Sequence, residues 1–392
     1  MYRDLIIYTP MYVTFFWAVV LLTTTSKNNR AKYFLGIFMV AAFFVYLSHA
    51  VFFNQNHSAY IFFDPVYTFA SLSVYPLYYL YIKLLTIETE YKWRNLRLLI
   101  PAMLLSVISA TIYLIMSPAE REMYLTEFLL REGNTGVYPL LLQLQKGVFI
   151  LSRLVFTVQV ILFLVLGRKL VIRYNKHVAN FYSNLESKTI VWVNLLLYSF
   201  VITSVMSIVF NVLGRSVFLN SVSLLLIPSL IFSVLLFFIG LQGYMQNHTV
   251  VNLIEDAKQQ PEKNLKEYNQ NQLKEKLMEL FVVEKIYRNS DLKITQISMK
   301  LQTNRTYVSQ LINNEFNCSF SEFANEYRVI EAKKLLVDQT YKNYSLDYIS
   351  ETVGFGSLNT FMRVFKELEG ITPGRFRDDN KVVKQGERLL PL

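Results

Sequence analysis

Long apolar stretches alternate with short polar connections over the first 243 residues of the chain. Six or seven of these stretches reach the roughly 20 apolar residues that a helix needs to cross a bilayer. We place them at 5–25, 33–54, 60–85, 98–117, 138–166, 189–213 and 221–243. The pattern predicts a transmembrane bundle of seven helices in residues 1–243.

The pattern becomes polar after Tyr244, and residues 244–268 indicate a linker. Apolar positions at helical spacing then predict an amphipathic helix over about 269–288. We expect its apolar stripe to pack either on the next domain or on a partner chain. The second alternative would make the protein a homodimer. We assign residues 269–378 to one all-helical domain and 379–392 to a tail. The stripe comprises Leu273, Leu277, Leu280, Phe281 and Ile286.

Residues 291–316 have the pattern of a helix-turn-helix. A short helix at 293–301 with one apolar face precedes a turn at Thr303 and Asn304, and Asn304 is suited to cap the second helix at 305–315. Polar side chains on the exposed face of that second helix can hydrogen-bond base edges or phosphates. These predicted DNA contacts are Arg305, Thr306, Ser309, Gln310 and Asn313.

The same pattern recurs after a longer predicted helix at about 319–338. Ser345 is suited to cap a short helix, Gly354 lies in a turn that favours positive φ, and residues 357–369 form the second recognition helix. Its apolar face buries Phe361, Val364, Phe365 and Leu368. Its outward face, predicted to contact DNA, comprises Leu358, Asn359, Met362, Arg363 and Lys366.

Composition and charge support this division of the chain. Hydrophobic residues make up 53% of the sequence and charged residues 17%, which is too apolar for an ordinary soluble protein of this size. The first 249 residues hold 18 of the 39 Lys and Arg but only 9 of the 29 Asp and Glu. The positive excess therefore lies in the apolar half, where membrane topology explains it better than nucleic-acid binding does.

Lys and Arg in the connections predict the orientation of the bundle, because cytoplasmic connections carry the excess of these residues. The first, third and fifth connections are basic and contain Lys27, Arg94 and Lys176, among others. The second has no Lys or Arg, and the sixth has only Arg215. We therefore expect the N-terminus outside and the C-terminal domain in the cytoplasm.

Four ionisable residues stand inside the predicted spans, at or below the outer leaflet. Ionisable groups in lipid are costly, so they should converge or face water. One interpretation is a pocket for a small-molecule or membrane signal, and the other is a structural ion pair of Asp64 with Lys146 or Arg153. The four residues are His49, Asp64, Lys146 and Arg153.

No pattern indicates enzymatic chemistry. Cys318 is the only cysteine and the four histidines show no ligand spacing, so we expect no disulfide and no metal site. No glycine-rich phosphate loop, nucleophile constellation or catalytic pair of carboxylates appears. We expect no catalytic residues and no cofactor.

The run Tyr344–Arg377, YSLDYISETVGFGSLNTFMRVFKELEGITPGRFR, resembles the defining motif of the AraC/XylS family of bacterial transcription regulators. Upstream, TYVSQLIN and YRVIEAKKLL resemble the first motif and the linking helix of that family. The resemblance covers about 290–377. Gln310 stands where many members have arginine, and serine occupies both inner alanine positions, at Ser298 and Ser350.

The resemblance implies two helix-turn-helix units, joined by a rigid helix, that enter successive major-groove segments of double-stranded DNA. Base contacts carried over by position fall on Thr306, Ser309, Gln310, Leu358, Asn359 and Arg363. We therefore expect a transcription regulator in the bacterial inner membrane that couples an external or membrane cue to gene expression. Two alternatives remain: a transporter or channel with a regulatory tail, and a receptor whose C-terminal domain binds a partner protein.

Overall fold

The computed structural model describes residues 2–24, 30–87, 92–130, 138–186, 188–190, 201–202, 205–206, 222–246, 253–254, 256 and 269–386. Every regular element in these residues is a helix, and their only strand-like pairing is an isolated antiparallel bridge between Tyr182 and Lys293. The prediction of an all-α chain is confirmed for the described part. The chain divides into two compact units, Met1–Ile172 with Ile190–Val251, and Arg173–Thr189 with Asn252–Leu392.

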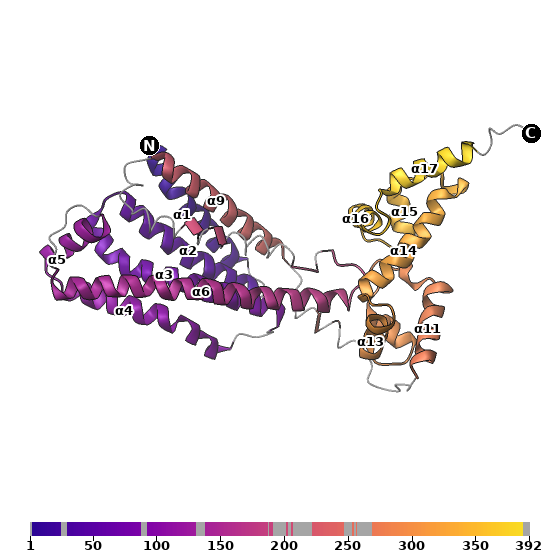
Figure 1. The fold of residues 1–392 in the computed structure, drawn as a ribbon, viewed down its shortest axis with the longest axis horizontal. Coiled ribbons are helices and arrows are strands. Elements are labelled where there is room, and N and C mark those ends of the chain that lie inside the picture. The colour runs from indigo at the N-terminus through magenta and orange to yellow at the C-terminus, as the bar shows by residue number, and fades with distance from the viewer. Residues whose placement is uncertain are drawn as a thin grey trace, which may run out of the picture. The chain divides into compact units, whose positions relative to one another are not determined.

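The first unit is built mainly from long helices (indigo to pink in Figure 1). Helix α2 packs against α1 and α3, α1 packs against α9, and α3 packs against α4. Helix α6 runs from this unit into the second one. The elements are α1 (Tyr2–Thr23), α2 (Arg30–Phe53), α3 (His57–Thr86), the 3₁₀ helix η1 (Trp93–Leu99), α4 (Ile100–Ile115), α5 (Pro118–Met123), the π-helix η2 (Tyr124–Leu129), α6 (Leu140–Ala179) and α9 (Val222–Met245).

Five helices in the described residues are long and apolar enough to cross a membrane. They correspond to the predicted first, second, fourth, fifth and seventh spans: Arg3–Thr23, Arg30–Phe53, Trp93–Ile115, Leu140–Ala179 and Leu224–Met245. The third predicted span is helix α3, which is not among the five; it contains several tyrosines, which lower its hydropathy, together with Asp64 and Lys83. The sixth predicted span, 189–213, lies largely outside the described residues.

Close packing joins these helices on their inner faces. A side chain at Gly240 of α9 would overlap the Trp17 ring of α1, so glycine permits the two helices to approach closely there. Tyr78 and Tyr81 of α3 are fully buried in the unit. The outer faces are apolar as well, and only 17% of the apolar window of α6 is enclosed by the protein. Exposed apolar surface of this extent is typical of contact with lipid.

The second unit holds the C-terminal helices (orange to yellow in Figure 1), together with residues 173–189. Helix α14 is its centre, because it packs against η3, α13, α15, α16 and α17. The elements are α11 (Gln270–Val282), the 3₁₀ helix η3 (Ile286–Arg288), α12 (Ile294–Lys300), α13 (Arg305–Glu315), α14 (Phe320–Val337), the 3₁₀ helix η4 (Gln339–Tyr341), α15 (Leu346–Thr352), α16 (Leu358–Glu369) and α17 (Pro373–Gly386).

The first amphipathic helix is shorter than predicted. Helix α11 ends at Val282, and Lys285 then adopts a left-handed conformation with φ of 51°. Ile286 therefore belongs to η3, and the prediction that the helix runs to 288 was wrong. The stripe of Leu273, Leu277, Leu280 and Phe281 is buried within the chain, so packing on the next domain is the alternative that the structure supports.

Candidate nucleic-acid interface and a pocket among the apolar helices

Helices α12 and α13 form the first predicted DNA-binding pair. Asn304 caps α13, since its side-chain oxygen accepts a hydrogen bond from the Thr306 amide at 2.8 Å. Ser298 is completely buried in α12, which is consistent with a small residue at a close helix crossing. Val308, Leu311 and Ile312 fix the inner face of α13, so the opposite face is presented outward.

The predicted DNA contacts on α13 differ in exposure. Thr306 and Gln310 are exposed, whereas Arg305, Ser309 and Asn313 are half-buried. The Asn313 amide donates a hydrogen bond to the Ser309 hydroxyl at 3.3 Å. The polar row predicted for this helix therefore lies on one face, with Thr306 and Gln310 the most accessible.

Helices α15 and α16 form the second pair. Ser345 and Ser357 cap them, as their hydroxyls accept hydrogen bonds from the amides of Tyr348 at 3.0 Å and Thr360 at 3.3 Å. Gly354 has φ of 93°, and a side chain there would collide with the carbonyl oxygens of Tyr287 and Arg288. Glycine is therefore required at this position both by the positive φ of the turn and by the close approach of the backbone at Tyr287 and Arg288.

The outward face of α16 is less extensive than predicted. Asn359, Arg363 and Lys366 are exposed, and Met362 is half-buried. Leu358 packs against the core cluster formed by α14, α15 and α16, so its outward placement was wrong. Leu368, predicted to be buried, is 51% exposed because the helix extends beyond the core there. The Arg363 guanidinium pairs with Glu367 one turn along at 3.0 Å, with both side chains exposed.

A segment that the sequence did not single out lies against this unit. Residues 180–186, here called the docking segment, follow directly after α6. The Phe181 carbonyl accepts a hydrogen bond from the Ile294 amide at 2.9 Å, and the Ser183 amide donates to the Leu292 carbonyl at 3.0 Å. Phe181, Tyr182 and Ser183 are buried. A segment of seven residues outside a helix carries no periodicity that could have predicted this contact.

Arg328 of α14 holds the docking segment through hydrogen bonds to Ser183. The residue is 1% exposed, and its guanidinium donates to the Ser183 hydroxyl at 2.9 Å, to the Tyr287 carbonyl at 2.8 Å and to the Asn289 carbonyl at 2.9 Å. Burial lowers the pKa of Arg328 to about 10, so the group stays protonated near neutral pH. A buried cation of this kind is stable because carbonyl and hydroxyl oxygens surround it.

A second ionic cluster ties η3 to α14. Glu331 accepts hydrogen bonds from Lys285 Nζ at 2.7 Å and Arg288 Nε at 3.0 Å, while its own side chain is 6% exposed. Burial opposes ionisation of Glu331, but the hydrogen bonds from Arg288 and Lys285 outweigh it and lower its pKa to about 2. The carboxylate is therefore charged throughout the physiological range.

The described residues contain no cluster of three or more His, Cys, Asp or Glu side chains that could hold a metal ion. Cys318 is a free, half-buried thiol, and its pKa is raised to about 11 by burial and by the neighbouring Glu322 and Glu326 carboxylates. A protonated thiol of this kind is a poor nucleophile and a poor metal ligand.

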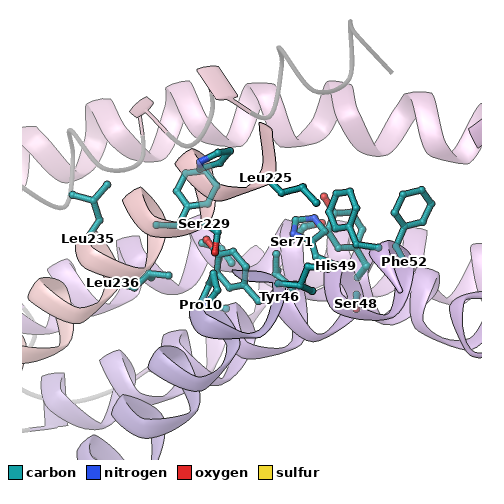
Figure 2. A pocket seen from close by; sticks show the side chains of 18 of the residues that line it. Pro10, Tyr46, Ser48, His49, Phe52, Ser71, Leu225, Ser229, Leu235 and Leu236 are labelled. Atoms are coloured by element: carbon teal, nitrogen blue, oxygen red, sulfur yellow. The ribbon is translucent and has the colours of Figure 1, made fainter. Parts of the chain in front are cut away.

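A cavity of about 220 Å³ lies in the first unit, lined by residues of α1, α2, α3, α6 and α9. Figure 2 shows Pro10, Tyr46, His49, Ser71 and Ser229 among the side chains around it. Most of its described lining is aliphatic or aromatic. His49 and Arg153 are the only ionisable nitrogen-bearing side chains in that described lining. The cavity is therefore mainly apolar, with one cationic side chain, Arg153, in its wall.

Arg153 is held in this wall by aromatic rings. Its Nη1 donates to the Tyr67 hydroxyl at 3.2 Å, and its guanidinium carbon lies 4.7 Å from the centre of the Phe149 ring. The His49 ring lies 5.2 Å from that of Tyr67. Nε of Arg153 is buried and has no hydrogen-bond partner among the described residues. A ligand oxygen could satisfy this donor.

The structure brings together only two of the four predicted pocket residues. Asp64 is buried outside the described cavity lining and accepts hydrogen bonds from the hydroxyls of Tyr60 at 2.6 Å and Tyr113 at 3.0 Å. The Lys146 ammonium lies 5.3 Å from the centre of the Phe128 ring. Within the described residues no ion pair joins Asp64 to Lys146 or Arg153, so the structural-pair interpretation is not supported there.

Two short helix pairs, α12–α13 and α15–α16, lie before and after the central helix α14, and α13, α15 and α16 begin at side-chain caps and pack on it. This arrangement defines the second unit as a helix-turn-helix class of DNA-binding domain. In agreement, residues 297–379 match a family model described as "Helix-turn-helix domain". The probable transcription factor PqrA of Proteus vulgaris is 30% identical over 94 residues, which are 24% of this chain and 75% of that protein. This chain belongs to the AraC-type family of helix-turn-helix transcription regulators.

Other relatives match over a similar length but are longer proteins. The uncharacterized HTH-type transcriptional regulator YtdP of Bacillus subtilis is 34% identical over 92 residues, 24% of this chain and 12% of that protein. The xylose operon regulatory protein of Haemophilus influenzae is 34% identical over 86 residues, 22% of this chain and 21% of that protein. The matched region of this chain thus covers less than a quarter of the length of these two relatives. No solved structure matches it.

Proposed function

We propose that this chain is a membrane-bound transcription regulator that couples an external or membrane cue to DNA binding. Two helix-turn-helix motifs, α12–α13 and α15–α16, would enter successive major-groove segments of double-stranded DNA. Seven helices would cross the bacterial inner membrane with the N-terminus outside and the second unit in the cytoplasm.

One observation carries the proposal: the same chain contains five helices of membrane-spanning length and apolarity and a family-matched DNA-binding domain. A DNA-binding domain functions only on the cytoplasmic side. The basic residues in the predicted cytoplasmic connections, such as Arg94 and Lys176, agree with that placement. The transporter alternative would be favoured by broken helices, but α3 continues through Pro65 and Pro76, and α9 through Pro228.

Topology reporters fused to the full chain test the membrane part. We expect fusions after Arg94 and Lys176 to report the cytoplasm, and fusions after Asn56 and Thr126 to report the outside. Chromatin immunoprecipitation of the full chain then tests the DNA part, with an Arg363→Ala variant as control. An external report after Lys176, or no enrichment of any promoter by the full chain, would contradict the proposal.

The cavity supports a specific proposal for the sensing role. We propose that it receives an apolar molecule with one anionic or hydrogen-bond-accepting group, which would face Arg153. The apolar lining suits the body of such a ligand, and the unsatisfied Nε of Arg153 suits its oxygen. The signal would enter among the helices, and α9 and α6 would pass the change in packing toward the second unit.

An Arg153→Gln variant tests this role in cells through a reporter gene at the regulated promoter. We expect output to become independent of the inducing condition while protein level and DNA binding stay normal. Arg168→Gln is the matched control, because Arg168 is exposed on the same helix and is not among the described lining residues. A normal response in Arg153→Gln would exclude Arg153 from signal binding.

A further inference from the structure

The docking segment contacts the beginning of both recognition helices. Thr360 is in the first turn of α16, and its hydroxyl donates a hydrogen bond to the Glu186 carboxylate at 3.3 Å. Arg305 is the first residue of α13, and its guanidinium lies 5.5 Å from the centre of the Phe181 ring. The two contacts place parts of one short segment at two positions that are predicted to approach DNA.

The Glu186 carboxylate at the start of α16 resembles a DNA phosphate in charge and in accepting hydrogen bonds. A helix N-terminus carries partial positive charge and unsatisfied amides, so it attracts anions such as phosphate. Glu186 holds a carboxylate at this end of α16, and the Phe181 ring lies beside the guanidinium of Arg305 at the start of α13. Asn184 lies against Gly356, directly before the Ser357 cap.

We propose that the docking segment and the DNA backbone compete for this surface, so that the segment weakens DNA binding until it is displaced. The proposal rests on the proposed DNA-binding function and names its regulation. Since the segment continues directly from α6, a change in that helix would alter its hold on the DNA-binding unit. Release of the end that carries Glu186 removes this negative charge from the start of α16.

The middle of the docking segment is held by buried hydrogen bonds at Ser183. Release of one end is therefore enough to change the surface that DNA would contact. Ser183 accepts a hydrogen bond from the buried Arg328, and its carbonyl accepts one from Ser321 at 3.0 Å. The contacts at Glu186 and Phe181 lie to either side of this anchor. The end that carries Glu186 is exposed, whereas Phe181, Tyr182 and Ser183 are buried, and its contact with α16 is the 3.3 Å hydrogen bond from Thr360. This end can therefore be released first.

A charge variant of the full-length protein in lipid nanodiscs tests the competition. The probe is a pool of short random-sequence duplexes, because phosphate contacts dominate binding to any sequence. We expect Glu186→Gln to tighten binding about threefold, the order of effect that one charge at a helix N-terminus has. Glu275→Gln is the control, since it removes an equal charge from the exposed face of α11. An equal effect of the two variants would overturn the proposal.

A reversible lock gives a second measurement. Asn184→Cys and Gly356→Cys, in a Cys318→Ser background, can be joined by a short cleavable thiol crosslinker. We expect the crosslinked protein to bind the duplexes at least about tenfold more weakly than the same protein after cleavage. Equal binding before and after cleavage would overturn the proposal while leaving the DNA-binding function intact. No binding to any duplex, including by the unmodified full chain, would instead overturn the proposed function and this proposal with it.

Discussion

Exposure at single positions separates the polar residues of α13 and α16 that are accessible from those that are half-buried. On α16, Asn359, Arg363 and Lys366 stand clear of the core, whereas Leu358 contributes to it. Arg363 pairs with Glu367 on its own helix, in an exposed ion pair of small energy. Its guanidinium can therefore exchange this partner for a base edge at little cost.

We predict that Arg363→Ala weakens specific DNA binding by about 1–3 kcal/mol and relaxes base preference at one position. Lys366→Ala should weaken binding to all sequences about equally and reduce the dependence of affinity on salt. Affinities of the full chain for selected and unselected duplexes, measured at several salt concentrations, separate the two effects. Unchanged base preference in a folded Arg363→Ala variant would show that this residue contacts only phosphate.

At the scale of elements, η3 and α14 are joined through Glu331. This carboxylate is nearly buried and receives hydrogen bonds from Lys285 and Arg288, which flank the left-handed turn after α11. The cluster therefore sets where the N-terminal helix α11 ends and where the first helix pair begins. It also explains why a pattern of apolar residues alone extends the predicted helix too far.

We predict a loss of stability of this joint at acid pH. The folded-state pKa of Glu331, about 2, lies below the usual value near 4.3 in an unfolded chain. The stabilisation is therefore complete above the unfolded-state pKa and is lost as pH falls toward 2. Since Lys285 and Arg288 are partly exposed and solvent screens their charges, we expect ionised Glu331 to contribute about 1–2 kcal/mol to the free energy of unfolding. Hydrogen exchange of α14 peptides in the full chain should lose protection in this window, and Glu331→Gln should remove the pH dependence.

At the scale of the whole molecule, the DNA-binding unit includes two separate parts of the chain, residues 173–189 and 252–392. Arg328 is the physical reason that both are needed. Without Ser183 its buried guanidinium loses oxygen partners, and an unsatisfied buried charge is strongly destabilising.

We predict that a fragment of residues 252–392 is less stable than the same fragment joined to 173–189 through a flexible linker. The expected difference is about 2–4 kcal/mol, the range for breaking one side of a buried polar network. Chemical denaturation of both fragments measures it. Ser183→Ala in the joined fragment removes one of the oxygen partners of Arg328 and should therefore lower its stability by part of this difference. Equal stability of the two fragments would show that Arg328 finds other partners.

The sequence by itself determined the helical class, the two helix pairs and most of their caps. These features depend on local periodicity and on capping residues such as Asn304, Ser345 and Ser357, which act within a few residues of their position. The outward faces of α13 and α16 followed from the same periodicity, apart from Leu358 and Leu368 at the margins of the core.

Only the tertiary structure decided which distant residues meet. It separated Asp64 from Arg153 by supplying two tyrosine hydroxyls as partners, and it placed Arg153 with His49 around an apolar cavity. It also brought Ser183 to Arg328, across 145 positions of the chain. A sequence pattern reports the period of one element, whereas contacts of this kind depend on how several elements pack. For that reason the position of the docking segment at the start of both recognition helices emerged only from the folded chain.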